Sequence, residues 1–381
     1  MKNIVILALH LGTGGIENAI SSISNILCDK YNVKIISTYK LQDNPAFELD
    51  KKIKIEYLID DKPNKIELQN AIKHFNIFNI VKEAIKSVKI LYLRKHCMIN
   101  AIKKIDADIV ISTRDIHNKL LGKYGKKNII KIAQEHNHHN DNIKYINKVI
   151  KSLKYIDYFM PTSKELSDFY KEKLKNSKIK VRFIRNSIGY YPNKVSNLEK
   201  QNIISVGRLS PEKGYLDLIE VFKKVINKYP DWNLKIVGDG PQRDELERKI
   251  KTERLEKYIE LPGFKNKKEL EEIALNSSIY VMTSYTESFG LVLIEAESYG
   301  LPILVFDSAQ GANEIVQNEQ NGYLIKGRNK DEMANKIMQL IESKELRKQM
   351  GQVGRKLSES YKKDNVATLW YDFIDSCEKQ I

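Results

Sequence analysis

The sequence predicts an α/β protein built from two doubly wound parallel sheets, one in each half of the chain. The apolar runs are continuous rather than alternating, and an amphipathic helical stretch follows each run, as in parallel sheets covered on both faces. This pattern runs twice, with an irregular seam near residues 184–201. A chain of 381 residues also exceeds one ordinary core, so two domains are expected.

The predicted elements follow from short runs of branched aliphatic residues that polar or glycine-containing segments separate. In the first half, strands are expected at 3–9, 32–38, 107–113, 128–136 and 156–163, with a helix at 15–30. In the second half, strands are expected at 201–209, 232–240, 259–263 and 278–284, with helices at 214–229, 241–254 and 267–275. We place the domains at 1–188 and 189–361.

Composition indicates a soluble globular protein, with 42% hydrophobic and 30% charged residues. No apolar stretch is long enough for a transmembrane helix. Three scattered cysteines favour a reducing cytoplasm and exclude a disulfide framework.

Residues 1–190 hold 35 basic and 19 acidic side chains, against 29 and 30 in the remainder. The basic half predicts an anionic partner, such as a membrane surface, nucleic acid or phosphorylated substrate, unless its lysines serve only solubility.

Glycine-rich motifs follow the predicted strands, where open α/β sheets bind their ligands. "LGTGGIENAI" at 11–20 carries Gly14 and Gly15 before a helix whose N-terminus could bind an anion, although a tight turn alone explains it equally well. "SVGRLSPEKG" at 205–214 contains Gly207, and its Arg208 and Lys213 could converge on one phosphate or remain solvated cations.

"VGDGP" at 237–241 supplies Gly238 and Gly240 and is at least a strand-to-helix turn.

The stretch "TESFGLVLIEAESYGLP" at 286–302 combines a strand end, a helix start and three glutamates. A helix is expected to begin between Ser288 and Gly290, so that the N–H groups of Phe289, Gly290 and Leu291 form a seat for a diphosphate.

Glu287 lies just before this helix, and Glu295 and Glu297 point about 200° apart on it. One of that pair should face the cleft and the other water or a partner. Carboxylates beside a phosphate-binding site are suited to accept hydrogen bonds from the hydroxyl groups of a sugar and a ribose. The alternative is that Glu287 interacts with the helix dipole and Glu295 forms a salt bridge.

These motifs resemble, in order and spacing, the retaining family 4 glycosyltransferases with the GT-B fold. The shared segments are "GGIE" (14–17), "VGRLSPEKG" (206–214), "VGDGP" (237–241) and "ESFGLVLIEAESYGLPIL" (287–304), which includes the E-x7-E element. The resemblance spans nearly the whole chain. It implies two Rossmann-like domains facing across a cleft, an acceptor-binding first domain, a nucleotide-sugar-binding second domain, and a C-terminal helix, about 362–381, that packs back on the first.

The resemblance also implies roles for individual residues. Arg208 and Lys213 would neutralise the diphosphate, Glu287 would bind the donor sugar, and Glu295 the ribose. The N–H groups of Gly290 and Leu291 would contact phosphate, and Gly14 and Gly15 would line the cleft. In "AQEHNHHN" (133–140), His136 is the active-site candidate, with His138 and His139 less so. Their spacing does not suit a metal, so neither metal nor cofactor is expected.

The implied reaction is transfer of a hexose or N-acetylhexosamine, most simply from a UDP-sugar, to a lipid-linked or polymeric glycan in bacterial surface polysaccharide synthesis. In residues 73–105, apolar side chains such as Phe75, Phe78, Ile85 and Leu93 interleave with lysines. That pattern is typical of a helix at an anionic membrane surface, or of one packed on its own domain. Alternatives for the whole chain are a nucleic-acid- or membrane-binding protein that uses its basic half, and a GT-B sugar-nucleotide epimerase.

Overall fold

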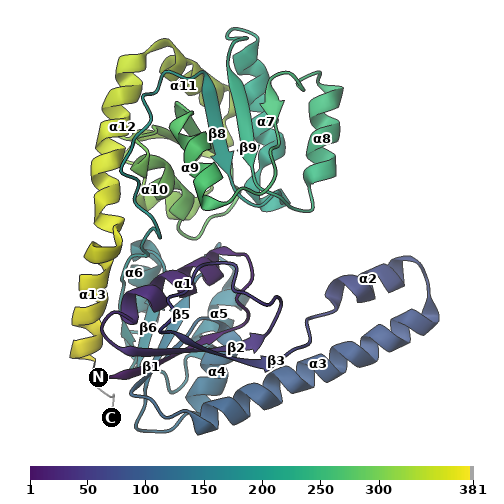
Figure 1. Ribbon diagram of the computed structural model, residues 1–381, viewed down its shortest axis with the longest axis vertical. Helices are drawn as coiled ribbons and strands as arrows, with labels where there is room; N and C mark the ends of the chain where they lie inside the picture. Colours follow the sequence, from purple (N-terminus) through teal and green to yellow (C-terminus); the bar gives the residue numbers. More distant parts are fainter. Residues whose placement is uncertain (378–381) are drawn as a thin grey trace. The chain divides into compact units, whose positions relative to one another are not determined.

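The computed structural model describes residues 1–377 as two compact units (Figure 1). Unit 1 comprises Met1–Ser187 together with the segment from Ala367 on, and unit 2 comprises Ile188–Val366. Each contains one fully parallel sheet flanked by helices. The predicted fold class, two Rossmann-like α/β domains, is therefore confirmed.

The sheet of unit 1 has the strand order β3-β2-β1-β4-β5-β6-β7. Its strands are β1 Asn3–Ala8, β2 Asn32–Tyr39, β3 Lys54–Ile59, β4 Ile109–Ser112, β5 Ile130–Glu135, β6 Tyr158–Pro161 and β7 Lys180–Val181. Its helices are α1 Gly15–Leu27, α2 Lys65–Lys73, α3 Ile77–Lys104, α4 Asp115–Tyr124, α5 Ile143–Ser152 and α6 Lys164–Lys173. The strand order reverses between β1 and β4, so the loops after these two strands lie at the topological switch point.

Helix α13 (Lys363–Ser376) completes unit 1 with the residues from Ala367 on. Trp370, Phe373 and Ile374 are buried, and the Tyr31 hydroxyl donates to Asp375 Oδ1 at 2.8 Å. Lys2 Nζ donates to the carbonyl of Ile374 at 2.7 Å. The last four residues of the expected C-terminal helix, 378–381, lie outside the described part of the chain.

The sheet of unit 2 has the order β10-β9-β8-β11-β12-β13. Its strands are β8 Asn202–Val206, β9 Asn233–Val237, β10 Ile259–Glu260, β11 Ile279–Met282, β12 Ile303–Phe306 and β13 Gly322–Ile325. Its helices are α7 Tyr215–Ile226, α8 Arg243–Thr252, α9 Lys267–Leu275, α10 Leu291–Ser298, α11 Lys330–Glu342 and α12 Lys344–Ser358, with short 3-10 turns η1 Pro211–Lys213, η2 Gln310–Glu314, η3 Lys326–Arg328 and η4 Glu359–Tyr361. The switch point lies between β8 and β11, which places "GRLSPEKG" and "TESFG" side by side.

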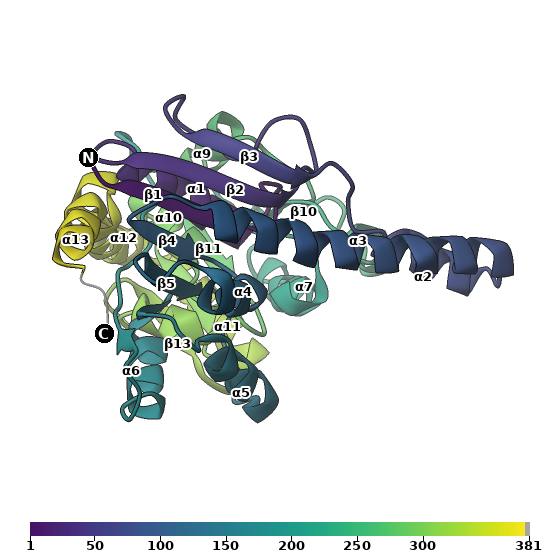
Figure 2. The ribbon, with the colours of Figure 1, turned by 90° about the horizontal axis from the view of Figure 1, so that it is seen from below.

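Helices α2 and α3 form a hairpin whose tip extends away from the sheet of unit 1 (Figures 1 and 2). Only the inner part of α3 packs on the domain: Leu93 lies against a small cluster that includes Tyr39 and Ile90. Phe75, Phe78 and Ile85 are exposed, so packing on the unit's own core does not account for the outer part. Within residues 1–377, no helix is long and apolar enough to cross a membrane.

Candidate functional site

Three predicted residues come together at the switch point of unit 2. Arg208 follows β8, Lys213 ends η1, and Glu287 lies in the loop between β11 and α10. Lys213 Nζ forms an ion pair with Glu287 Oε2 at 2.6 Å, and both side chains are about one-fifth exposed (21% and 19%). Arg208 is exposed, and its side chain has no hydrogen bond or ion pair with the described residues. The sequence assigned Lys213 and Glu287 to different parts of a donor, whereas the structure joins them directly.

The two loops meet because Gly214 allows a close backbone approach. Gly214 has a φ of 66°, and a Cβ there would lie 2.2 Å from the carbonyl oxygen of Thr283. The Thr283 hydroxyl donates to the carbonyl of Lys213 at 3.1 Å. The N–H of Tyr285 donates to the carbonyl of Glu212 at 2.8 Å. These contacts fix the position of Lys213 relative to the loop that carries Glu287.

Arg328, which the sequence analysis missed, stabilises the loop after β11 that contacts Lys213. Its guanidinium donates to the carbonyls of Ser284 and Thr283, both at 3.0 Å, and forms an ion pair with Asp217. It also lies 3.7 Å from the ring centre of Tyr285. No local motif marks this arginine, because its partners come from the loop after β11 and from α7, which are distant in sequence.

The helix after Glu287 begins later than predicted. Gly290 has a φ of 91° and caps α10, so Leu291 is the first helical residue. The leading N–H groups are therefore those of Leu291 and Val292, because the N–H of Leu293 already donates to the carbonyl of Gly290. The expectation that the N–H of Phe289 belongs to the first turn is wrong.

Ser288 and Phe289 belong to the loop that precedes α10. The Phe289 side chain is buried in the unit's core, with its ring centre 5.9 Å from that of Tyr361. A left-handed residue at the cap, which only a glycine adopts without strain, accounts for the delayed helix start.

Gly311 in η2 shapes this loop and carries no signal that the sequence analysis used. Its N–H donates to the carbonyl of Glu287 at 2.9 Å. A Cβ at Gly311 would lie 2.4 Å from the backbone nitrogen of Phe289. The loop that presents Glu287 therefore rests directly on the backbone at Gly311.

Gly207, Gly238 and Gly240 lie where the loops after β8 and β9 touch. A Cβ on Gly238 would lie 1.9 Å from the carbonyl oxygen of Gly207, and one on Gly240 2.4 Å from that of Leu209. The N–H of Gly207 donates to the carbonyl of Val237 at 3.0 Å. These glycines bring the loops together; their predicted contact with a donor stays a prediction.

Glu295 lies on the first turns of α10, partly buried near the strand ends. Burial raises the pKa of its carboxyl group to about 7. Both Glu295 and Glu287 raise the pKa of the buried Tyr280 hydroxyl, after the larger effect of that tyrosine's own burial. The two carboxylates of the E-x7-E element therefore lie close enough to Tyr280 to affect the same hydroxyl group. That hydroxyl lies beside the end of β8, where it donates to the carbonyl of Val206 at 3.4 Å.

Glu297 does not face water, contrary to one of the predicted alternatives. It is 1% exposed, and Asn321 donates a hydrogen bond to its Oε1. Its side chain also packs against Gly354, where a Cβ would come within 3.1 Å of Glu297 Cγ. Glu297 therefore holds α10 to α12 and to the loop before β13, and burial raises the pKa of its carboxyl group to about 8.

This raised pKa predicts how stability depends on pH. The folded state retains a proton that the unfolded state releases above about pH 4.5, so the contribution of Glu297 is greatest below that pH and is lost as the pH rises to 8. Glu297→Gln keeps an acceptor for Asn321 without a charge. We expect it to raise the free energy of unfolding at pH 8.5 by on the order of 2–4 kcal/mol, with little effect at pH 4.5.

Denaturant unfolding of unit 2 at the two pH values measures this effect. Glu256→Gln, at an exposed position whose side chain has no hydrogen bond or ion pair among the described residues, is the matched control and should change neither value. Equal stability of wild type and Glu297→Gln at pH 8.5 would contradict the assignment of a costly buried charge.

In unit 1 the loops at the switch point gather a second set of polar residues. Arg114, after β4, pairs with the buried Glu17 of α1 at 2.9 Å, and His10 Nδ1 lies 3.6 Å from the same Glu17 oxygen. A Cβ on Gly14 would lie 2.2 Å from Glu17 Oε2, whereas Gly15 is open. Only the glycine motif was predicted here; Arg114 lies 97 residues from Glu17 and has no motif of its own.

His136 follows β5 and is buried, with its Nε2 lacking a hydrogen-bond partner among residues 1–377. Burial, and then the charge of Arg114, lower its pKa to about 3. Its imidazole is therefore neutral at physiological pH and can donate or accept a hydrogen bond, but it cannot serve as a general acid there. The ring of His139 packs at a tilt against the rings of His138 and Phe169, with ring centres 4.6 and 4.2 Å apart.

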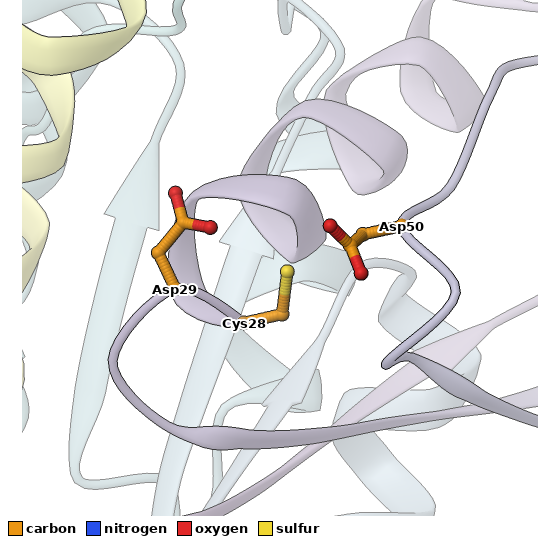
Figure 3. A group of neighbouring side chains, drawn as sticks. All are labelled: Cys28, Asp29 and Asp50. Carbon is orange, nitrogen blue, oxygen red and sulfur yellow. The ribbon is translucent and has the colours of Figure 1, made fainter.

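Among the described residues, Cys28, Asp29 and Asp50 form a group whose possible metal-ligand atoms lie within 4.8 Å of one another (Figure 3). The Cys28 thiol reaches the carbonyl of Asn25 at 3.5 Å, and Asp50 Oδ1 accepts from the N–H of Lys52 at 2.8 Å. The group lies at the C-terminal end of α1, which in a βαβ unit is the edge of the sheet opposite the strand ends. We assign it no role in the site.

Comparison with known proteins defines the class. Residues 191–357 match the family described as glycosyl transferases group 1. A crystal structure of S. aureus TarM in complex with fondaparinux, α-GlcNAc-glycerol and UDP superposes with a TM-score of 0.79 at 16% identity, covering 99% of this chain and 100% of that one. The protein is accordingly a glycosyltransferase with the GT-B fold, and residues 191–357 are similar to the group 1 family.

Among individual relatives, an uncharacterized glycosyltransferase of Haemophilus influenzae is 29% identical over 378 residues, covering 97% of this chain and 99% of the relative. The amylovoran biosynthesis glycosyltransferase AmsD of Erwinia amylovora is 34% identical over 177 residues, covering 46% of this chain and 49% of AmsD. The chain thus spans nearly all of the first relative and about half of the second.

Proposed function

We propose that the protein is a retaining glycosyltransferase that transfers a hexose or N-acetylhexosamine from a nucleotide sugar, in the first instance a UDP-sugar, to a lipid-linked or polymeric glycan of a bacterial surface polysaccharide. The observation that carries the proposal is the Lys213–Glu287 ion pair at the unit 2 switch point, between loops that also carry Arg208 and the start of α10. UDP in the TarM complex and the polysaccharide named for AmsD support the donor and the pathway class.

The proposed roles follow from the charges at the site. Arg208, Lys213 and the N–H groups of Leu291 and Val292 would hold the diphosphate, which gains negative charge as the bond from C1 of the sugar to its oxygen breaks. In the absence of a diphosphate, Glu287 neutralises Lys213 at 2.6 Å. With donor present, Lys213 would turn to phosphate while Glu287 accepts hydrogen bonds from sugar hydroxyls.

No side chain of the cluster is placed as a covalent nucleophile. The acceptor oxygen would form its bond to C1 on the face that the diphosphate leaves, and its proton would pass to the departing phosphate oxygen. His136, neutral because of burial, would contribute a hydrogen bond to the donor sugar or acceptor and no charge.

Unit 1 would supply the acceptor-binding surface and unit 2 the donor site. We propose a cytoplasmic setting with attachment to the inner face of the membrane through the basic unit 1.

Glu295 provides the sharpest test of the donor site. Glu295→Gln is isosteric, but an amide is a weaker acceptor for ribose hydroxyls than a carboxylate, so the Kd for the donor nucleotide should rise about 10- to 100-fold. Because the pKa of Glu295 is about 7, wild-type affinity should also weaken as the pH falls from 8 to 6, and the variant should lose this dependence.

Thermal shift and calorimetric titration with UDP, GDP and ADP and their sugars measure both effects. Glu297→Gln, two residues along the same helix and buried against Asn321, is the matched control and should bind donor like wild type. NMR of the transferred sugar's anomeric configuration tests retention. No binding by any of the three nucleotide classes would overturn the proposed donor site.

A further inference from the structure

The tip of the α2–α3 hairpin exposes large apolar side chains that folding would normally bury. Phe75, Ile77 and Phe78 are 87%, 77% and 78% exposed. Among the described large hydrophobic residues, only Met1, at the start of the chain, falls in this range. A contiguous exposed apolar group of this kind marks an interaction surface rather than the scattered exposure of ordinary proteins.

The exposed side chains continue from the tip along one face of α3. Ile77, Val81, Ile85, Val88 and Tyr92 recur every three or four residues, the spacing that places side chains on one face of a helix. All five are at least 52% exposed. A different face of α3 packs toward α2, where Glu83 and Ser87 bind Asn64, which lies just before that helix. We call Phe75, Phe78 and these five residues the apolar stripe.

The backbone at the tip adds a second observation. Phe75 has a φ of 51°, in the left-handed region that bulky residues rarely occupy. A glycine or asparagine would make this turn with less strain, and a polar residue would suit an exposed position better. The folded chain therefore gives Phe75 neither a relaxed backbone nor a buried side chain. This combination favours a role for its ring in contacting something other than this chain.

Charge identifies the kind of surface that the stripe fits. Residues 62–95 hold eight Lys or Arg and two Glu. Lys73, Lys82 and Lys89 are exposed and have no ion pair with any described residue. Two copies of this hairpin would bring like charges together, whereas an anionic lipid surface offers both apolar depth and complementary charge.

We infer that the α2–α3 hairpin is a membrane-docking arm, which inserts the apolar stripe into the interfacial zone of an anionic bilayer while its lysines contact lipid phosphates. Helix α3, with 28 residues, is about 42 Å long, enough to lie along the surface over several lipids. Membrane attachment is thereby assigned to insertion of this one hairpin, and not to a general electrostatic attraction between the whole basic unit and the lipid surface. The inference does not depend on the donor site of unit 2.

Flotation with vesicles of phosphatidylcholine alone, or with 30% phosphatidylglycerol, tests this assignment at about physiological salt. We expect the full chain to float with the anionic vesicles. Phe78→Ser should lower the partition constant severalfold, and Phe75→Ser/Phe78→Ser at least tenfold. Phe264→Ser, at a 70% exposed phenylalanine of unit 2, is the matched control and should float like wild type.

Charge and insertion are tested separately. Lys82→Glu/Lys89→Glu should lower binding at least tenfold, whereas Lys119→Glu/Lys151→Glu, which changes the same charge on exposed lysines of α4 and α5, should lower it much less. In Phe78→Trp, tryptophan emission should shift to shorter wavelength only with anionic vesicles. Nucleotide binding by the variants verifies that unit 2 remains folded.

Three results would overturn the inference: no flotation of the wild type, equal loss in both lysine pairs, or unchanged binding of Phe75→Ser/Phe78→Ser. A concentration-dependent dimer in sedimentation, abolished by Phe75→Ser/Phe78→Ser, would instead assign the stripe to a second copy. Because donor binding is measured on the same samples, failure of the arm and failure of the proposed transferase activity are distinguishable.

Discussion

Arg208→Ala and Lys213→Ala are each expected to lower kcat/KM for glycosyl transfer by roughly 100- to 1,000-fold, or about 3–4 kcal/mol of transition-state stabilisation. The physical reason is that, in the proposed reaction, negative charge develops on the leaving diphosphate, which we propose these two cations at the unit 2 switch point to bind. The Arg208 side chain has no hydrogen bond or ion pair among the described residues. Lys213 has a partner, Glu287, so its loss also leaves a partly buried carboxylate unpaired.

Steady-state kinetics with the donor that stabilises the protein best would measure this loss. Arg248→Ala and Lys257→Ala, cations of unit 2 away from the switch point, are the matched controls and should remain within a factor of two of wild type. If Arg208→Ala and Lys213→Ala both kept a third or more of the wild-type kcat/KM, the cluster would not be the phosphate site.

Gly311→Ala is expected to have the second large effect, although residue 311 touches no predicted donor atom. The added methyl group would lie 2.4 Å from the backbone nitrogen of Phe289, so the loop from Glu287 to Gly290 must move. We expect a loss of about 1–3 kcal/mol in the free energy of unfolding. Displacement of Glu287 and of the start of α10 should weaken donor binding at least tenfold.

Gly189→Ala provides the comparison, because a Cβ there meets no atom within 4 Å. Denaturant unfolding and nucleotide titration of both variants separate the two effects. Wild-type affinity in Gly311→Ala would show that the loop position is not what binds the donor.

The predicted strands were located correctly because a continuous apolar run records burial on both faces of a sheet. Runs such as 3–9 and 278–284 became β1 Asn3–Ala8 and β11 Ile279–Met282. Motifs at strand ends then placed Arg208, Lys213 and Glu287 at one edge, since parallel strands bring their carboxyl ends together. The start of α10 was misplaced because the left-handed cap at Gly290 depends on the packing of the loop against Gly311, which local sequence does not show.

The remaining differences have the same origin in contacts between distant residues. Helix geometry alone leaves Glu297 free to face solvent, but Asn321 and Gly354 enclose it in the folded unit. Arg114 and Arg328 carry no motif, yet they hold Glu17 and the end of β11. For residues 73–105 the sequence left membrane and core packing equally open, because periodicity describes an apolar face without saying whether the fold covers it.

The return of α13 to unit 1 has a consequence for synthesis of the protein. Unit 1 requires Trp370, Phe373 and Ile374, which the ribosome adds only after all of Ile188–Val366. At the usual 5–20 residues per second, that interval lasts roughly 10–35 s. Throughout it the nascent first unit lacks the helix that covers Tyr31 and Lys2, so this face is exposed to chaperones before the chain can close it.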